Sequence, residues 1–326
     1  MSPTAPPRIS ICILGYNRFD DTVAKALASL HEDPAAPTWE FIVVDNASDA
    51  DNRAAFDRAK AQYPRIHLHH LDVNVGYPGG MNACLARATG EFFILVSSDI
   101  IVPPGMVDRL VAGFDANPSA GLIAPVTSFA GNAQQIWTKP SGDVPFIIAQ
   151  GLSFANATDG GADWLPAYRL DFCCVAMRRT VYDQLGGLDE RYIPGYFEDF
   201  DYSLRARAAG FDLLIAENAF VYHEGGATFG RMSEVKRELA RRNRVYFLET
   251  HGANTPMPHE RSANAAMLEA YADAAQAGTP PSPSRIANRF MTAMARRPKG
   301  LLKRWQYLRR LAAVRRRLAP FIRRGA

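Results

Sequence analysis

Three carboxylates within four residues, Glu198, Asp199 and Asp201 in the run GYFEDFD, form the densest candidate for chemistry in the chain. They stand at the start of a predicted helix over residues 198–209, where the helix dipole favours negative charge and offers a structural explanation. Acids this close repel one another unless a cation or a reaction requires them. One of them could take a proton from an acceptor hydroxyl. Arg205 follows Asp201 at the spacing of a helical ion pair and could simply neutralise it.

Further polar side chains directly follow predicted strands. Asp45 comes after the apolar run Phe41–Val44, and its carboxylate could accept the imide N–H of uracil or thymine. A turn or a helix cap explains Asp45 equally well. Asp99 follows the predicted strand Glu91–Val96 and could hold Mg²⁺ or Mn²⁺ against a diphosphate, or cap a helix. His223 follows a short strand, as a metal ligand or as a structural side chain.

The segment NVGYPGGMN, residues 74–82, places three glycines between two asparagines just before a predicted helix. Glycine lets the backbone approach a ligand closely, and a helix N-terminus offers free N–H groups to an anion. An ordinary turn is an equally good explanation. The spacing is not the dinucleotide fingerprint, and no Gly-Lys-Ser/Thr of a phosphate-binding P-loop follows.

Apolar, β-branched runs alternate with helical patterns through the first hundred residues. This alternation predicts an α/β fold with a mostly parallel central sheet, flanked by helices on both faces. Ligands on such sheets bind beyond the carboxyl ends of the strands, where Asp45 and Asp99 are predicted to lie. Residues 127–168 show no regular period, and we interpret them as an acceptor-facing region. A strand is predicted over residues 169–177.

The chain has 326 residues and a globular composition, which indicates one large body with a smaller attachment. We divide it into an α/β domain over residues 1–250 and a helical extension over 251–326, with a linker at about 278–284 (GTPPSPS). The four cysteines include no CxxC pair, so a zinc knuckle is not expected. Neither a signal peptide nor a membrane span is recognisable, and the chain is expected to be cytoplasmic.

The net charge of +4 is unevenly distributed, because fourteen Lys and Arg and no Asp or Glu occur from Arg285 to the end. Leu301, Trp305 and Leu308 recur at helical spacing among these cations. A basic amphipathic helix over residues 285–326 could lie on an anionic membrane. Packing against the acidic remainder of the chain is an equally open alternative, and nucleic acid is a less favoured one.

Taken in order, these segments resemble the family 2 glycosyltransferases with the GT-A fold, from about Ile9 to about Gly226. The resemblance rests on GYNR at 15–18, VVDNAS at 43–48, NVGYPGGMN at 74–82, a strand ending in Asp99, GGLDE and FEDFDYSLR over 186–205, and VYHEGG at 221–226. The most similar subgroup is that of the rhamnosyltransferase-like enzymes of bacterial cell-surface polysaccharides.

The resemblance implies roles for the matching residues on the donor side. Six of them would contact the nucleotide-sugar: Tyr16, Asn17, Asp45, Asn74, Gly80 and Asn82. Within this set, Tyr16 and Asn17 would line the nucleotide pocket and Asp45 would bind the nucleobase. The other three would lie along the nucleotide and the donor sugar.

The resemblance also implies a divalent cation, Mg²⁺ or Mn²⁺, on Asp99 and His223. Asp99 matches the last acid of the family's DxD motif, but Ser97 replaces the first acid and weakens the expected cation site. Asp199 would be the catalytic base. The neighbouring Glu198, Asp201 and Arg205 would support it on the acceptor side.

The implied reaction is a single displacement that inverts the anomeric centre. A sugar would pass from dTDP-rhamnose or a UDP-sugar to a hydroxyl of a saccharide or lipid-linked saccharide, at the inner face of the cell membrane. A sugar nucleotidyltransferase is one alternative, but it would show a glycine-rich basic loop where this chain has GYNR. A non-catalytic binding module is another, and it would not need the acids at 198–201.

Overall fold

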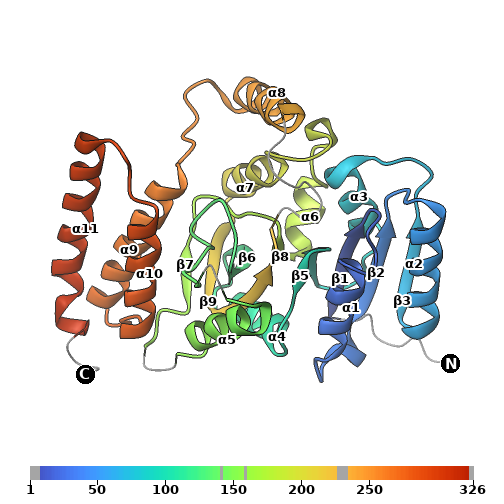
Figure 1. The fold of residues 1–326 in the computed structure, drawn as a ribbon, viewed down its shortest axis with the longest axis horizontal. Helices are drawn as coiled ribbons and strands as arrows, with labels where there is room; N and C mark the ends of the chain where they lie inside the picture. Colours follow the sequence, from blue (N-terminus) through green and yellow to red (C-terminus); the bar gives the residue numbers. More distant parts are fainter. Residues whose placement is uncertain (1–7, 140–141, 158–159, 226–233, 323–326) are drawn as a thin grey trace.

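A nine-stranded sheet forms the centre of the computed structural model, which describes residues 8–139, 142–157, 160–225 and 234–322 (Figure 1). The strands are β1 (Ile9–Gly15), β2 (Glu40–Asp45), β3 (Ile66–His70), β4 (Phe92–Ser97), β5 (Ile100–Ile101), β6 (Ala120–Thr127), β7 (Trp164–Pro166), β8 (Cys174–Arg178) and β9 (Asp212–His223). The helices are α1 (Val23–His31), α2 (Ala50–Gln62), α3 (Gly76–Leu85), α4 (Met106–Ala116), α5 (Val144–Ala155), α6 (Arg179–Leu185), α7 (Glu198–Ala208), α8 (Glu234–His251), α9 (Glu260–Gln276), α10 (Pro283–Ala295) and α11 (Leu301–Ile322).

The sheet has two halves with different strand directions. Its order is β3-β2-β1-β4-β8-β6-β9-β5, and β7 pairs with β9 off this path. The strands β3, β2, β1 and β4 are parallel, as predicted. From β8 onward the sheet is mixed, because β8 runs antiparallel to both neighbours while β6 and β9 are parallel. The predicted α/β fold is therefore confirmed, with parallel pairing concentrated in the N-terminal half.

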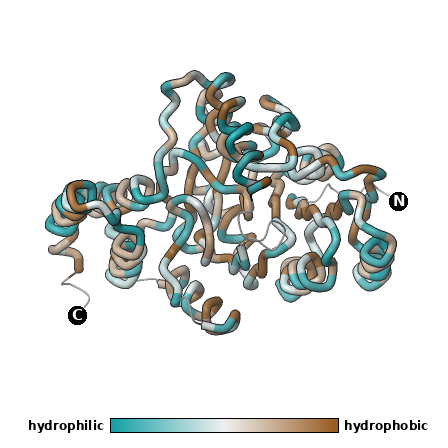
Figure 2. The backbone as a smooth tube through the Cα atoms, turned by 45° about the horizontal axis from the view of Figure 1, so that its top comes forward, coloured by the Kyte–Doolittle hydropathy of each residue, from teal (hydrophilic) through white to brown (hydrophobic). Residues whose placement is uncertain are grey.

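Alternate residues of the parallel strands feed two hydrophobic cores on opposite faces of the sheet. In β4, for example, Phe93 and Leu95 belong to one core, whereas Ile94 and Val96 belong to the other. Helices α1, α2 and α4 cover the second face, and α3, α7 and the C-terminal helices cover the first. Burial on both faces explains the continuous apolar runs in the sequence, and brown, hydrophobic stretches of the backbone tube gather toward the centre of Figure 2.

The region between residues 127 and 178 differs from its prediction. Helix α5 and strand β7 lie in the segment expected to lack regular elements. Asp143 caps α5 by accepting a hydrogen bond from the Phe146 N–H, and a proline at the start of the helix supports it. Strand β8 begins only at Cys174, so residues 169–173 form a loop rather than the first half of a strand.

The C-terminal helices pack onto the sheet and share a hydrophobic core with it. Residues of α9, α10 and α11 join strand residues in one buried cluster. The predicted linker is folded against the body: the Gly161 N–H donates to the Pro280 carbonyl at 2.8 Å, and buried Ser282 caps α10. Residues 277–282 join α9 to α10, and the last two residues of GTPPSPS already belong to α10.

Two arginines of the basic tail are buried inside the protein. Arg285 pairs with Asp163 at 2.8 Å, and Arg289 forms an ion pair with the fully buried Glu217 of β9. Arg289 also donates to the backbone carbonyl of Gln135, so α10 braces the loop after β6. These two cations cannot face a membrane. The predicted membrane surface over residues 285–326 is therefore wrong for Arg285 and Arg289. Residues 323–326 of the tail lie outside the described residues. Among the described helices, none is long and apolar enough to cross a bilayer.

Candidate active site

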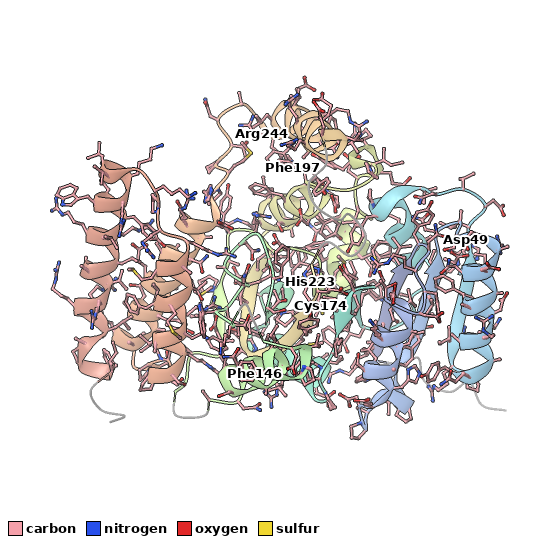
Figure 3. All side chains as sticks on the ribbon, in the orientation of Figure 1. Asp49, Phe146, Cys174, Phe197, His223 and Arg244 are labelled. Atoms are coloured by element: carbon pink, nitrogen blue, oxygen red, sulfur yellow. The ribbon has the colours of Figure 1, made fainter. Side chains whose placement is uncertain are left out.

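A cavity of about 1280 Å³ opens where the carboxyl ends of β1, β2 and β4 meet the start of α7. This is the edge of the sheet at which the sequence predicts ligand binding. Six of the predicted site residues line the cavity: Tyr16, Asn74, Asp99, Glu198, Asp199 and His223. Figure 3 shows His223 near the centre of the molecule, with Phe197 above it. The other six predicted residues lie outside the cavity wall.

The loop after β2 forms the wall next to β1. Asn46, rather than Asp45, lines the cavity there. Its amide donates to the Asn74 side chain at 3.1 Å and to the Gly76 carbonyl at 3.2 Å, and its oxygen accepts from the Val75 N–H. These bonds tie the two asparagine-containing loops together, with Asn74 exposed to the cavity.

Asp45 lies fully buried beside this wall. One carboxylate oxygen accepts from the Ser48 N–H at 2.9 Å, and the other contacts His70 Nδ1 at 2.7 Å. His70 in turn reaches Asp57 at 3.1 Å. Asn17 holds the same turn, since its side chain accepts from the Asp49 N–H. In this structure Asp45 and Asn17 shape the strand ends, and their contact with a nucleotide stays a prediction.

Gly80 and Asn82 act in packing rather than at the cavity surface. A Cβ at Gly80 would lie 2.4 Å from Leu14, so glycine is what allows α3 to approach β1 closely. The Asn82 side chain donates to the Leu188 carbonyl and accepts from the Leu188 N–H. It thereby fastens α3 to the loop that leads into α7.

Asp99 and His223 come together through strand pairing at the end of the sheet. The pairing of β5 with β9 places Ile100 opposite His223, and His223 Nε2 lies 3.4 Å from an Asp99 oxygen. His223 Nδ1 contacts the Phe129 carbonyl at 2.8 Å, which leaves Nε2 directed at Asp99. Burial opposes protonation of His223, but Cys173 and Asp99 outweigh it and raise the pKa of His223 to about 11. Gly226 of the VYHEGG motif lies outside the described residues.

The acids of α7 enter the cavity from a strained turn. Tyr196 and Phe197 both have left-handed backbone angles, with φ of 74° and 78°. The buried amide of Asn243 in α8 holds this turn by donating to the carbonyls of Tyr192, Gly195 and Tyr196. The turn directs Glu198 and Asp199 into the cavity. Asn243 belongs to none of the motifs recognised in the sequence, so its role in this turn was not predicted.

Both cavity acids of α7 resist ionisation. Burial and the nearby Asp171 raise the pKa of Asp199 to about 6, and Arg169, 3.8 Å away, partly offsets this rise. Burial and the neighbouring Asp199 raise the pKa of Glu198 well above its usual range. One Glu198 oxygen is buried without a hydrogen-bond partner among the described residues. Raised carboxylate pKa values in a cavity are typical of functional sites.

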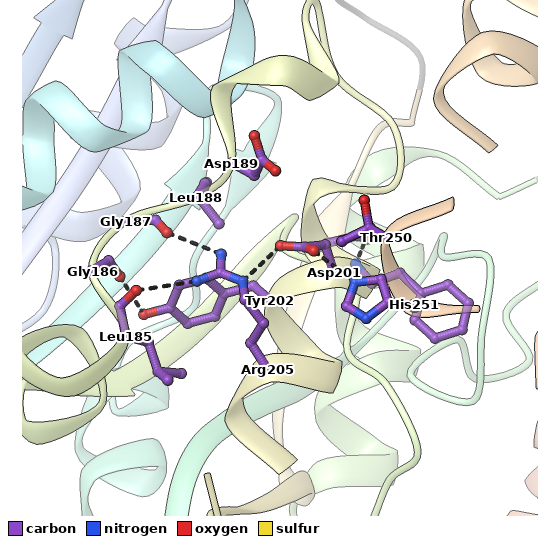
Figure 4. A network of polar contacts seen from close by, with 12 residues as sticks. Leu185, Gly186, Gly187, Leu188, Asp189, Asp201, Tyr202, Arg205, Thr250 and His251 are labelled. Carbon is purple, nitrogen blue, oxygen red and sulfur yellow. Dashed lines mark hydrogen bonds and ion pairs between the residues drawn. The ribbon is translucent and has the colours of Figure 1, made fainter. Parts of the chain in front are cut away.

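Asp201 and Arg205 lie on the opposite side of α7. Asp201 is buried and pairs with Arg205 at 2.8 Å and with His251 at 2.7 Å. Arg205 also donates to the carbonyls of Leu185 and Gly187, as Figure 4 shows. The predicted helical ion pair is therefore present, and it fastens α7 to its neighbours away from the cavity.

Several cavity residues belong to no motif recognised in the sequence and were not predicted as site residues. Arg169, Asp171 and Cys173 come from residues 169–173, for which the sequence predicts a strand and the structure shows a loop. Phe129 and Gln135 follow β6, and Arg296 comes from the end of α10. Arg169 pairs with Asp171 at 2.6 Å, so this loop places a second charged pair beside Asp199.

Comparison with known proteins decides the family. The family model described as glycosyl transferase family 2 matches residues 10–186, more than half of the chain. The chain belongs to glycosyl transferase family 2. The matched span includes Tyr16, Asn74 and Asp99, and it ends before α7 begins at Glu198. This family 2 protein is therefore a glycosyltransferase, as the resemblance implied.

Two relatives of this family 2 glycosyltransferase are named as a rhamnosyltransferase and as an O-antigen biosynthesis protein. The chain is 26% identical over 231 residues to an N-acetylglucosaminyl-diphospho-decaprenol L-rhamnosyltransferase of Mycobacterium tuberculosis, covering 63% of this chain and 72% of that protein. It is 26% identical over 242 residues to the O-antigen biosynthesis protein RfbC of Myxococcus xanthus, covering 68% of this chain and 18% of that protein.

Solved glycosyltransferases share the GT-A fold with this chain. The mannosyltransferase PcManGT of Pyrobaculum calidifontis, solved with GDP-Man and Mn²⁺, aligns with a TM-score of 0.55 at 19% identity, over 96% of this chain and 81% of that one. GalNAc-T7, solved with UDP, GalNAc and Mn²⁺, aligns with a TM-score of 0.56 at 15% identity, over 74% and 48%. At these identities the likeness shows the fold alone.

Proposed function

We propose that this glycosyltransferase moves a sugar from a nucleotide-diphosphate donor to an acceptor hydroxyl with inversion, and that Asp199 is the catalytic base. The observation that carries the proposal is that Asp99, His223 and Asp199, far apart in the chain, line one cavity. Asn46, Asn74 and Tyr16 line the same cavity and are suited to hold the nucleotide. The two solved proteins of the same fold contain GDP-Man in one case and UDP with GalNAc in the other, which is consistent with a nucleotide-diphosphate donor.

The residues at the end of β9 fit a divalent cation. Asp99 offers a carboxylate, and His223 would offer Nε2 after giving up its proton to solvent as the cation binds, while its other nitrogen is fixed by the Phe129 carbonyl. No cluster of three or more His, Cys, Asp or Glu suited to a metal occurs in the part of the chain that the structure describes. Two protein ligands suffice where a diphosphate supplies the rest, as is usual for Mg²⁺. A cation bound here would neutralise negative charge on the diphosphate leaving group.

Asp199 is suited to remove the acceptor proton. Its pKa of about 6 leaves it ionised at neutral pH yet basic enough to accept a proton. In the proposed step the acceptor oxygen attacks the anomeric carbon while Asp199 takes its proton. The bond to the diphosphate breaks on the other side, and the configuration is inverted. The charged pair Arg169–Asp171 adjusts the basicity of Asp199 from the cavity wall.

We further propose dTDP-rhamnose or a UDP-sugar as the donor and a lipid-linked saccharide as the acceptor, at the inner face of the cell membrane. The rhamnosyltransferase of Mycobacterium tuberculosis supports this assignment, because its name specifies a decaprenol-linked acceptor. The cavity wall combines polar side chains with the aromatic rings of Phe129, Tyr196 and Phe197. This combination also suits a saccharide that is attached to a lipid carrier.

The donor is tested by measuring hydrolysis and transfer for the full chain with Mn²⁺ across dTDP-, UDP- and GDP-sugars. We expect one dTDP- or UDP-sugar to be turned over and a chelator to abolish turnover. The anomeric configuration of the product, determined by NMR, should be opposite to that of the donor. Retention of configuration would overturn the single displacement, and turnover restricted to GDP-sugars would overturn the donor assignment.

A further inference from the structure

The turn between α10 and α11 exposes a group of large apolar side chains. Leu301 is 86% exposed, Leu302 68% and Trp305 55%. Met291 and Met294, on the last turns of α10, are also exposed. Leu301 is the most exposed large apolar residue in the described part of the chain. We call these five residues, with the cations among them, the α10–α11 corner.

Helix α11 joins the body only from its second turn onward. Its buried residues begin at Tyr307 and continue through Leu311, Val314 and Leu318. Arg310 pairs with Glu269 at 2.6 Å, and Arg317 pairs with Asp273, so the later turns are also held by charge. The six residues 301–306 are all exposed. Packing on the body therefore explains the rest of α11 but not its first turn.

The cations of the α10–α11 corner have no acidic partners among the residues that the structure describes. They are Arg297, Lys299, Lys303, Arg304 and Arg309. No carboxylate of the described residues pairs with any of them, and Arg309 lies over the Trp305 ring at 4.6 Å. The corner thus combines protruding leucines, an indole and unneutralised positive charge. Such a combination suits an anionic bilayer surface, where apolar side chains enter the interface and cations meet the headgroups.

The α10–α11 corner also lies next to the cavity. Arg296, which ends α10, lines the cavity together with Glu260, and the two form an ion pair at 3.0 Å. Only four residues separate Arg296 from Leu301. A surface held at the corner would therefore stand beside the cavity rim.

We infer that the α10–α11 corner docks this glycosyltransferase on an anionic lipid bilayer and presents the cavity rim to it. The functional benefit of this docking, which is access to a lipid-linked acceptor, rests on the proposed function. The docking itself depends only on the α10–α11 corner. Exposed leucines have no role in binding nucleic acid through its phosphates, which argues against that alternative. The predicted membrane surface over residues 285–326 is thereby narrowed to its middle part.

Vesicle co-sedimentation of the full chain tests this inference, using phosphatidylcholine vesicles with and without phosphatidylglycerol. We expect pelleting with phosphatidylglycerol that weakens with salt. Leu301→Ser with Leu302→Ser, and separately Lys303→Ser with Arg304→Ser, should each lower vesicle affinity about tenfold or more. The matched control is Arg315→Ser with Arg316→Ser, which removes the same charge from an exposed site on the same helix and should cost much less.

Equal vesicle binding by the wild type and both corner variants would overturn the inference. Loss of self-association in the corner variants, seen by sedimentation velocity without any vesicle binding, would also overturn it and assign the corner to a contact between two copies. Donor hydrolysis in solution separates this test from the proposed function. The corner variants should retain it, and a wild type that binds vesicles without turning over any donor would contradict only the proposed function.

Discussion

The two faces of α7 carry carboxylates in opposite circumstances. On the inner face of the fold, Asp201 has two cationic or polar partners, Arg205 and His251, both within 2.8 Å. On the cavity face, Asp199 accepts a hydrogen bond from the Phe200 N–H at 2.7 Å, and the cation closest to it among the described residues is Arg169, at 3.8 Å. Glu198 has one oxygen without a partner among the described residues. One set of acids is neutralised by the protein, and the other is left incompletely neutralised.

This difference indicates which acids destabilise the fold and are retained for function. Buried charges normally persist only when they are paired, so an underpaired acid in a cavity indicates a ligand or a reaction. Asp201 and Arg205, matched by the resemblance to an acceptor-supporting role, instead hold α7 in place. Identical residue types two positions apart thus serve the scaffold and the site respectively.

The strongest test of the comparison is Asp199→Asn. Because the amide cannot accept the acceptor proton, we expect the transfer rate to fall by about 10²–10⁴-fold. Nucleotide binding, measured by calorimetry with Mn²⁺, should be retained. Glu198→Gln is the matched cavity control and should retain far more activity. Near-normal turnover by Asp199→Asn would remove Asp199 from the role of base.

The same substitution on the other face should act on stability. Asp201→Asn breaks two charged hydrogen bonds of a buried carboxylate, and we expect a loss of about 2–4 kcal/mol in the free energy of unfolding. Denaturant unfolding of the full chain measures this loss. If Asp201→Asn were as stable as the wild type, the description of this face as scaffold would be wrong.

Asp199→Asn should change the melting temperature in the opposite direction. The folded-state pKa of Asp199, about 6, lies above its unfolded value of roughly 3.9, so the ionised carboxylate destabilises the folded protein above pH 6. Removing that charge should raise Tm at pH 8 by roughly 2–4 °C. The gain should shrink as the pH falls below 6 and disappear below about pH 3, where both states are protonated. A lower Tm at pH 8 would contradict the claim that Asp199 is underpaired.

The cation site extends the comparison to the end of the sheet. Asp99→Ala should weaken nucleotide binding in the presence of Mn²⁺ by about tenfold or more, since half of the protein's ligand pair is lost. Without the cation, the wild type and the variant should bind the nucleotide similarly. Calorimetry with Mn²⁺ and with a chelator makes the distinction, and equal affinities in Mn²⁺ would dismiss Asp99 as a ligand.

Much of the fold could be predicted from the sequence, and the limits have physical causes. Strands buried on both faces produce continuous apolar runs, so β1, β2 and β4 were predicted correctly. Strand β3, with the sequence IHLHH, buries only Ile66 and shows no such run. Helix α5 was missed because its sequence, VPFIIAQGLSFA, is apolar nearly all round and shows no amphipathic period. The long strand β9 was predicted only in part, since a bulge shifts its pairing with β6 between Pro125 and Val126.

Motifs identify residue types, but the site could be predicted only where the sequence also indicates which way a side chain points. Asp199 and Asp201 lie about 200° apart around a helix, so both could not face one cavity. Asp45, Gly80 and Asn82 match their motifs, but burial and close packing turn them away from the cavity surface. Arg169 and Asp171 could not be found, because their contact with Asp199 depends on a loop whose path no local pattern specifies.

The smallest expected effect concerns how Arg169 and Asp171 shift the pKa of Asp199, the proposed base. Transfer should fall as the pH is lowered through about 6, because Asp199 is then protonated. Asp171→Asn removes a charge that raises this pKa and should move the acid limb of the pH–rate profile to lower pH, by roughly one unit. Arg169→Gln removes a charge that lowers it and should move the limb to higher pH. The control is Arg207→Gln, on an exposed part of α7, the helix that carries Asp199, and it should leave the acid limb in place. Identical acid limbs in all four proteins would mean that the cavity pair does not act on Asp199, and that the contrast between the two faces of α7 lies in packing alone.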